Sequence, residues 1–169
     1  MGDTKLNTKK IAMLGVLTAL YVVMSAFLKF TLFSNIMVDL GYIAFAFALC
    51  MFGMWGTVVG VLGCALESIL FSAYGFSISW CAANLVIGLM LGANYPTIKH
   101  TLVKYVLTVV AVAIGMLVVK TSIECALYGI PLAVKIPKNA VAFGVDTVVM
   151  LVGLGFYELI KKRIPQGLT

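Results

Sequence analysis

The chain consists largely of apolar segments that are long enough to cross a lipid bilayer, with only short polar breaks between them. Hydrophobic residues make up 63% of its 169 residues and charged residues 11%, and the mean hydropathy is +1.13. A hydrocarbon core about 30 Å thick requires about 20 apolar residues in an α-helix. The sequence therefore predicts an all-α integral membrane protein, with no room for a soluble catalytic domain.

Glycine, proline and short polar stretches divide the chain into six expected transmembrane helices in one bundle. Gly53 separates two short spans by a tight turn on the inner side, and Gly129 and Pro131 end the fifth span. The expected spans cover about residues 9–30, 39–52, 54–72, 77–91, 102–128 and 139–160. Because no internal repeat or linker interrupts them, residues 1–169 are expected to form a single domain.

Basic residues gather near both ends of the chain, at Lys5, Lys9, Lys10 and residues 161–163, and in the expected loop 92–101. By the positive-inside rule, both termini and this loop are expected to be cytoplasmic in a multi-pass protein of the cell membrane. The basic residues form no stripe with interleaved aromatic residues, so the lipid bilayer is an expected partner and nucleic acid is not.

Motifs for catalysis and metal binding are missing from the sequence. It has no Walker A motif, no H-E-x-x-H and no G-x-S-x-G, and His100 is its one histidine. Its four cysteines are isolated, without C-x-x-C spacing. We therefore expect no enzyme, no metal site, no cofactor and no ATP hydrolysis by this chain.

Four of the six acidic residues lie inside or at the edges of apolar segments: Asp39, Glu67, Glu124 and Asp146. A carboxylate in a membrane helix costs about 2.5–3.5 kcal/mol on insertion scales, so it usually faces the bundle interior and has a function. Counting spans from a cytoplasmic N-terminus places all four toward the outer half. This clustering predicts a polar pocket that opens to the outside.

Small and polar residues on three expected helix faces lead to the same depth. A glycine series ends at Glu67, Trp80 and Asn84 share a face, and Asn139 and Asp146 share another. Such a pocket suits a flat heteroaromatic ligand. The substrate-binding candidates are, first, Glu67, Trp80, Asn84 and Asp146, and second, Lys29, Asp39, Glu124, Tyr128 and Asn139.

Several of these residues have structural interpretations that stay open. Trp80 and Tyr128 could belong to an aromatic belt, and Asn84 could bond two helices together. Glu124 could pair with Lys120 one helical turn away. Three expected outer lysines, Lys29, Lys135 and Lys138, are either pocket or gate charges or lysines that reach the membrane interface. The outer loops 31–38 and 72–76 are expected to gate the pocket.

The first expected helix carries a stripe of small residues at Ala12, Gly15 and Ala19. Small residues let helices approach closely in a membrane. The stripe predicts either packing inside the bundle or a docking face for a second membrane protein.

Over nearly its whole length, the chain resembles the substrate-binding (S) component of an energy-coupling-factor (ECF) vitamin transporter. The resemblance rests on the first-helix stripe, the glycine-rich third helix that ends in Glu67, and the run from Glu124 to Pro131 before Lys135. It implies a six-helix bundle with cytoplasmic termini and one vitamin bound near the outer face. It also implies that the stripe docks on a transmembrane coupling subunit, while two ATPase subunits supply energy.

Within that family, residues 41–92 look most like the folate-type branch. Arg163 is the only arginine and is expected to be cytoplasmic, so no arginine is available to hold a substrate carboxylate. An acid-rich pocket suits N–H donors, such as the 2-amino-4-oxo-pyrimidine edge of a pterin or of a 7-deazaguanine queuosine precursor. Riboflavin, thiamin or a pyridoxal-type vitamin stay open, and so does a channel or scaffold subunit without a pocket.

Overall fold

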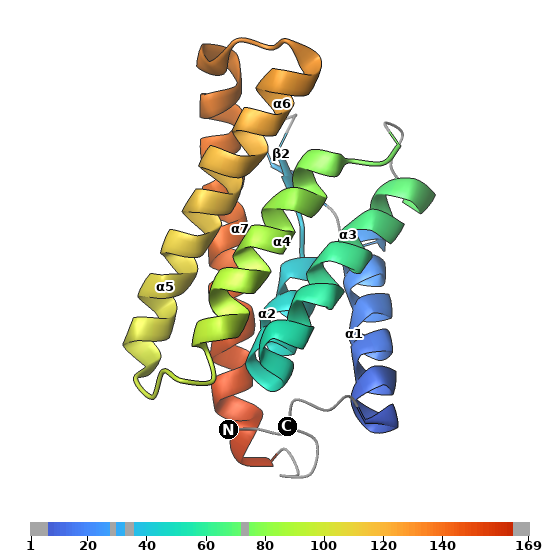
Figure 1. Ribbon diagram of the computed structural model, residues 1–169, viewed down its shortest axis with the longest axis vertical. Coiled ribbons are helices and arrows are strands. Elements are labelled where there is room, and N and C mark those ends of the chain that lie inside the picture. The colour runs from blue at the N-terminus through green and yellow to red at the C-terminus, as the bar shows by residue number, and fades with distance from the viewer. Residues whose placement is uncertain (1–6, 28–29, 33–35, 72–74, 164–169) are drawn as a thin grey trace.

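The structure, a computed structural model, describes residues 7–27, 30–32, 36–71 and 75–163 (Figure 1). Over this part of the chain it is predominantly helical. The helices are α1 (Thr8–Phe27), α2 (Gly41–Phe52), α3 (Thr57–Phe71), α4 (Ile78–Asn94), α5 (Thr101–Ala113), α6 (Thr121–Tyr128) and α7 (Leu132–Ile160). Single turns of 3-10 helix cover Gly53–Gly56 and Lys161–Arg163, and a π-helical segment, Ile114–Lys120, joins α5 to α6.

The described part of the chain has four helical stretches that are long and apolar enough to cross a membrane. They are Thr8–Phe27, Gly41–Phe71, Thr101–Tyr128 and Leu132–Ile160. Helix α4 is apolar but shorter. The stretch Gly41–Phe71 folds back on itself, because Gly53 has a φ of +56° and Gly60 lies against the ring of Phe45. The tight turn predicted at Gly53 is therefore confirmed.

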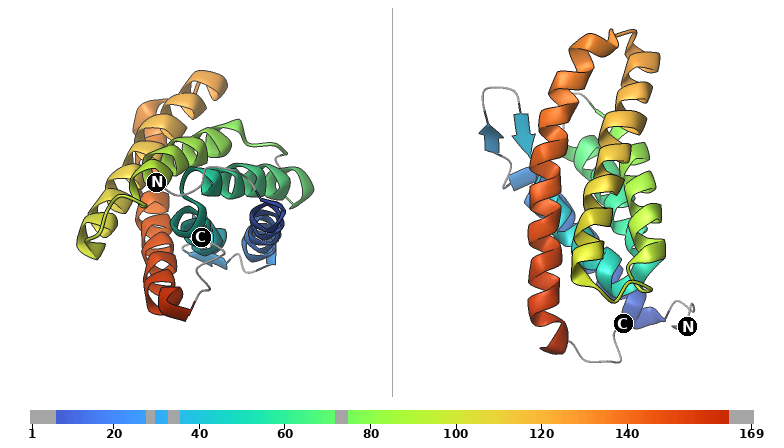
Figure 2. Two further views of the ribbon diagram at one scale, coloured as in Figure 1. Left: turned by 60° about the horizontal axis from the view of Figure 1, so that its bottom comes forward. Right: turned by 90° about the vertical axis from the view of Figure 1, so that its left-hand side faces the viewer.

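The bundle has two distinguishable ends. Helix α1 begins and α7 ends at one end, which we call the terminal end, whereas α6 meets α7 at the opposite, distal end (Figure 1). The continuous helix from α5 to α6 lies beside α7 along its length (Figure 2). Gly129, with a φ of +63°, ends α6 as predicted, since a left-handed conformation at this position suits glycine.

Helix α7 begins earlier than the sequence indicated. The prediction began this span near Asn139 and placed Lys135 and Lys138 in a loop, but both lysines lie on the helix, which begins at Leu132. Pro131 directly precedes the first helical residue with a φ of −59°. A proline with this dihedral favours a helix start, so the residue that was interpreted as a breaker also begins the next helix.

The segment expected to be an outer loop contains a short antiparallel hairpin within the otherwise helical fold. Strand β1 (Phe30–Leu32) pairs with β2 (Ile36–Val38), with Phe30 opposite Val38. Strand β2 packs against α7. Aromatic and β-branched residues are enriched in strands, which accounts for strands here.

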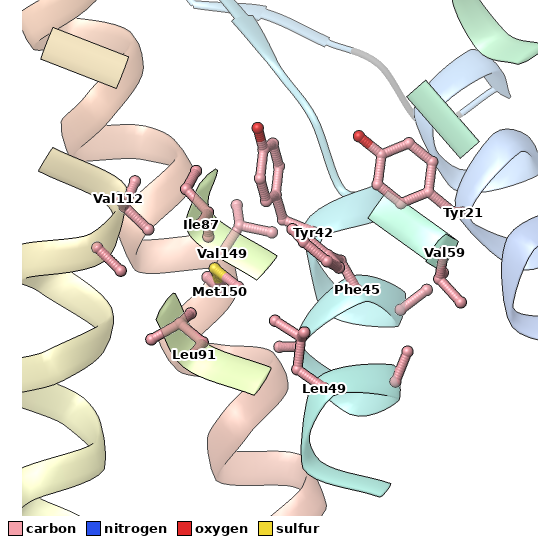
Figure 3. Packing of buried hydrophobic residues seen from close by; sticks show 14 of the residues in the cluster. Tyr21, Tyr42, Phe45, Leu49, Val59, Ile87, Leu91, Val112, Val149 and Met150 are labelled. Carbon is pink, nitrogen blue, oxygen red and sulfur yellow. The ribbon is translucent and has the colours of Figure 1, made fainter. Parts of the chain in front are cut away.

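Glycines allow the helices of the α1–α4 side to approach closely. A Cβ at Gly56 would lie 2.5 Å from the Ala48 carbonyl, and one at Gly63 would lie 2.6 Å from the Tyr21 ring. Toward the terminal end the core is apolar, with Leu49, Ile87 and Met150 fully buried. Figure 3 shows the hydroxyls of Tyr21 and Tyr42 pointing to the side away from Leu49. The core therefore changes from apolar to polar toward the distal end.

Candidate functional site

A hydrogen-bonded network of buried polar side chains connects α1, α2, α3 and α4 in the interior. Tyr42 donates its hydroxyl to Oδ1 of Asn84 at 2.7 Å. Nδ2 of Asn84 donates to the Gly60 carbonyl at 3.1 Å and to the Tyr21 hydroxyl at 3.4 Å. Asn84 is fully buried. The interpretation of Asn84 as a bond between helices is therefore confirmed, and the same bonds fix its position at the edge of the candidate site.

Asp39 lies two residues before the start of α2 and accepts from three donors among the described residues. Its Oδ1 accepts from Ser25 Oγ at 2.5 Å and from the Gly41 backbone N–H at 2.8 Å, while Oδ2 accepts from the Tyr21 hydroxyl at 3.3 Å. The positive end of the helix dipole also stabilises a carboxylate beside the first N–H groups of a helix. These bonds tie the start of α2 to α1.

Lys120, at the end of the π-helical segment, contacts the ring of Trp80 on α4. Nζ of Lys120 lies 3.5 Å from the centroid of the Trp80 ring, and the lysine is only 4% exposed. A cation over the face of tryptophan is attracted by the ring quadrupole, and this attraction strengthens when water is excluded. Trp80 is partly buried and packs against the core.

Asp146 on α7 is fully buried, and neither of its carboxylate oxygens has a hydrogen-bond partner within the described part of the chain. Its charge interacts with those of Lys120 and Asp39. Nearly all buried polar groups in folded proteins are hydrogen-bonded, so such a carboxylate requires an explanation. It is a buried acceptor that the described residues leave without a donor.

A second cluster joins α6 to α7 nearer the distal end. Glu124 forms an ion pair of 3.1 Å with Lys135 and accepts from Asn139 Nδ2 at 3.2 Å. Asn139 also donates to Thr121 Oγ1 at 2.9 Å. The expected ion pair between Glu124 and Lys120 is replaced, because Lys135 reaches Glu124 and the Trp80 ring holds Lys120.

The remaining predicted residues lie in different environments. Glu67 is buried on α3, one turn beyond Cys64, whose Sγ lies 3.8 Å from that of Cys81 on α4. Tyr128 is 60% exposed at the end of α6 and is not part of the buried cluster. Lys29 lies outside the described residues, as do residues 33–35 and 72–74 of the two expected gating loops.

The small-residue stripe of α1 faces outward. Ala12, Gly15 and Ala19 are exposed, and a Cβ added at Gly15 would meet no atom within 4 Å. The alternative prediction, that this stripe packs inside the bundle, is therefore wrong. A groove of about 1050 Å³, mostly apolar, lies at the terminal end between α1, the Gly53 turn and α4, with Lys10, Trp55 and Pro96 in its lining. This groove is separate from the buried polar cluster.

Sequence reasoning missed three residues of the cluster as site candidates. Tyr21 and Tyr42 were missed because a tyrosine in an apolar helix is usually an ordinary packing residue and gives no separate signal. Lys120 was considered only as the partner of Glu124. Its position inside a long apolar span was a usable signal, because a lysine costs as much there as a carboxylate.

The fold is shared with S components of known structure. The S component for biotin from an ECF-type ABC transporter aligns with a TM-score of 0.71 at 14% sequence identity, covering 97% of this chain and 98% of that chain. FolT bound with folic acid aligns with a TM-score of 0.70 at 19% identity, covering 89% of this chain and 95% of that chain. No curated protein matches the sequence. At these identities the two structures establish the fold alone.

A family model described as the ECF-type riboflavin transporter, S component, matches residues 5–157, which is nearly the whole chain. The resemblance to S components, first indicated by the glycine series and the run from Glu124 to Pro131, is thereby confirmed. The matching model is the riboflavin type, whereas residues 41–92 suggested the folate-type branch. S components are transporter subunits embedded in a membrane and are not enzymes. This chain belongs to the ECF-type riboflavin transporter S component family.

Proposed function

We propose that this chain captures a small heteroaromatic vitamin or nucleobase-like compound for an ATP-driven ECF importer. The observation that carries the proposal is the Asp146 carboxylate, fully buried and without a hydrogen bond from the described residues. A bound ligand with N–H donors would satisfy it. The ring of Trp80 offers a stacking surface at the same depth, and few polar groups in an otherwise apolar interior are typical of small-molecule sites.

The proposed binding residues are the predicted candidates that are buried or partly buried. Asp146, Trp80, Asn84 and Glu67 come first, and the neighbouring Asp39, Glu124 and Asn139 support them. Tyr128 is omitted, because its side chain is exposed at the end of α6. The acceptors favour a donor-bearing ring edge, as in a pterin or a 7-deazaguanine queuosine precursor. Riboflavin is the second candidate, because the family model that matches is named for it.

We further propose that the chain crosses the cell membrane six times, with both termini in the cytoplasm. The turn at Gly53 supports this count, because it divides Gly41–Phe71 into two antiparallel helices. The basic residues at both ends of the chain support the orientation. The polar cluster then lies in the outer half of the membrane, where a ligand arrives.

Docking to the transmembrane coupling subunit is proposed for the α1 stripe. Ala12, Gly15 and Ala19 are exposed on α1, which begins at the terminal end (Figure 1). Small exposed residues let a partner helix approach closely and gain dispersion contacts. The energy would come from two ATPase subunits of the partner module.

The experiment is to purify the chain in detergent and identify retained small molecules by native mass spectrometry. A retained heteroaromatic compound that binds again after removal, with an affinity weakened in Asp146→Asn, is the expected result. A folded sample that retains and binds none of pterin, 7-cyano-7-deazaguanine, folate, riboflavin, thiamin and pyridoxal contradicts the proposal. Such a result favours the rival interpretation, a channel or scaffold subunit without a pocket.

A further inference from the structure

Two opposite charges, Lys120 and Asp146, are buried in the same interior without forming an ion pair with each other. Both residues are at most 4% exposed. The described ion pairs use Lys104, Lys135 and Lys161 as cations and leave Lys120 out. Buried charges are normally paired, since an unpaired one costs several kcal/mol. Lys120 lies over the Trp80 ring and interacts electrostatically with Glu124 and Asp146, while the Asp146 oxygens accept no hydrogen bond from the described residues.

The position of the Lys120 ammonium limits how a flat ligand can bind. At 3.5 Å from the ring centroid, Nζ occupies the face of Trp80 on which an aromatic ring would stack. A ring cannot share that face with the ammonium, because offset stacking itself requires close contact between the two ring faces. A ligand that stacks on this face of Trp80 must displace Lys120 from it.

The helix around Lys120 is held by hydrogen bonds that do not involve the lysine side chain. Lys120 is the last residue of the π-helical segment Ile114–Lys120, and such segments often lie at functional sites. The next residue is fixed: Thr121 donates to the Met116 carbonyl at 3.1 Å and accepts from Asn139 at 2.9 Å. The helix is thus held directly after Lys120, while the lysine side chain has four rotatable bonds.

We propose that Lys120 is a ligand-binding residue that leaves the Trp80 face when a planar ring stacks there and then donates to an acceptor on that ring. Asp146 accepts from a donor on the same ring. This inference rests on the proposed function and narrows its substrate class to neutral rings with both a donor and an oxo or ring-nitrogen acceptor. Pterins, 7-deazaguanines and flavins meet this condition.

A permanently cationic ring such as that of thiamin does not fit this arrangement. It would lie beside the Lys120 ammonium in a site that excludes water, where like charges repel strongly. Lys120 therefore acts as a selector against cationic rings as well as a donor.

The test uses the full chain in detergent with Trp55→Phe, so that Trp80 is the only tryptophan. Pterin, 7-cyano-7-deazaguanine, riboflavin and thiamin are titrated while Trp80 fluorescence is recorded, and dissociation constants are confirmed by calorimetry. A neutral ring should quench Trp80 and bind. Lys120→Met should weaken that binding about ten- to a hundredfold, and Lys120→Arg should restore most of it.

Lys104→Met is the matched control. Lys104 lies on α5 near the terminal end, 5.9 Å from the Tyr95 ring centroid and paired with Glu158, so its removal should leave ligand affinity unchanged. Neutral-ring affinity that is the same in folded Lys120→Met as in wild type overturns the inference while leaving the proposed function intact, as does thiamin binding that is as tight as that of the neutral rings. Absence of binding by every compound to the folded wild type contradicts both proposals.

Discussion

Tyr42 on α2 donates its hydroxyl to Asn84 on α4 across 2.7 Å, and both side chains are fully buried. The bond lies at the boundary between the apolar core and the polar cluster. Asn84 also reaches the Gly60 carbonyl and the Tyr21 hydroxyl, so one amide fixes three neighbouring helices. The wall of the candidate site is therefore built before any ligand binds.

Replacing Tyr42 with phenylalanine should lower the stability of the ligand-free protein by about 1–3 kcal/mol, because Oδ1 of the buried Asn84 loses its donor. Thermal unfolding in detergent measures the effect. Tyr128→Phe is the control, since that tyrosine is 60% exposed and should show no shift. Equal melting temperatures for both variants would mean that the network contributes nothing to stability.

Substitution by alanine should change the stability of the bundle at one glycine and leave it unchanged at another. Gly56→Ala should destabilise the bundle by about 1–3 kcal/mol, because the new methyl group would lie 2.5 Å from the backbone of Ala48. Gly15→Ala should be tolerated, because a Cβ there meets no atom within 4 Å. Unfolding curves of the two variants against wild type decide the matter. A larger loss for Gly15→Ala would place the stripe inside the bundle after all.

Gly15→Leu should disrupt assembly with the coupling subunit and leave ligand affinity unchanged, because the leucine side chain blocks the close approach of a partner helix. Co-purification of the tagged chain with the coupling module, together with vitamin uptake into liposomes, provides the two readouts. Val16→Leu is the control, since Val16 is 67% exposed and already has a large side chain. Full assembly and uptake by Gly15→Leu would rule out this docking face.

Asp146→Asn should weaken ligand binding about ten- to a hundredfold, because a charge-assisted acceptor is lost while the size of the side chain is kept. Its effect on stability should be small. A neutral amide costs less to bury than a carboxylate, but Lys120 loses the electrostatic attraction of Asp146. Glu158→Gln makes the same change on the same helix near the terminal end, where Glu158 pairs with Lys104 and Lys161. If Asp146→Asn unfolds the protein and a tightly bound ligand does not restore it, the carboxylate has a structural function.

Much of the helical pattern followed from the sequence because its determinants are local. Gly53 and Gly129 adopt positive φ values, which few other residues tolerate, and both predicted breaks occur there. The start of α7 was misplaced because Pro131 carries the same signal for ending one helix and beginning another. The hairpin of β1 and β2 was missed because it depends on packing against α7, a contact far away in sequence.

The sequence predicted which acidic residues lie in the interior, but it did not predict which residues they contact. A carboxylate in an apolar span is costly wherever the helix packs, which predicted that these residues face the interior, and Glu124 and Asp146 are buried. Helical spacing suggested that Glu124 pairs with Lys120, but spacing compares residues within one helix only. Lys135 and Trp80, brought from other elements, form these contacts instead.

The unequal lengths of the helices have a consequence for the lipid around them. Helices α2 and α3 have 12 and 15 residues and rise about 18 and 22 Å, whereas Thr101–Tyr128 and α7 have 28 and 29 residues and rise about 42 and 44 Å. A bilayer core of about 30 Å is too thick for the first pair and too thin for the second. Hydrophobic mismatch of opposite sign within one molecule is relieved by tilt or by uneven local bilayer thickness. The acyl-chain length of the surrounding lipid thus becomes a determinant of how this protein sits in the membrane.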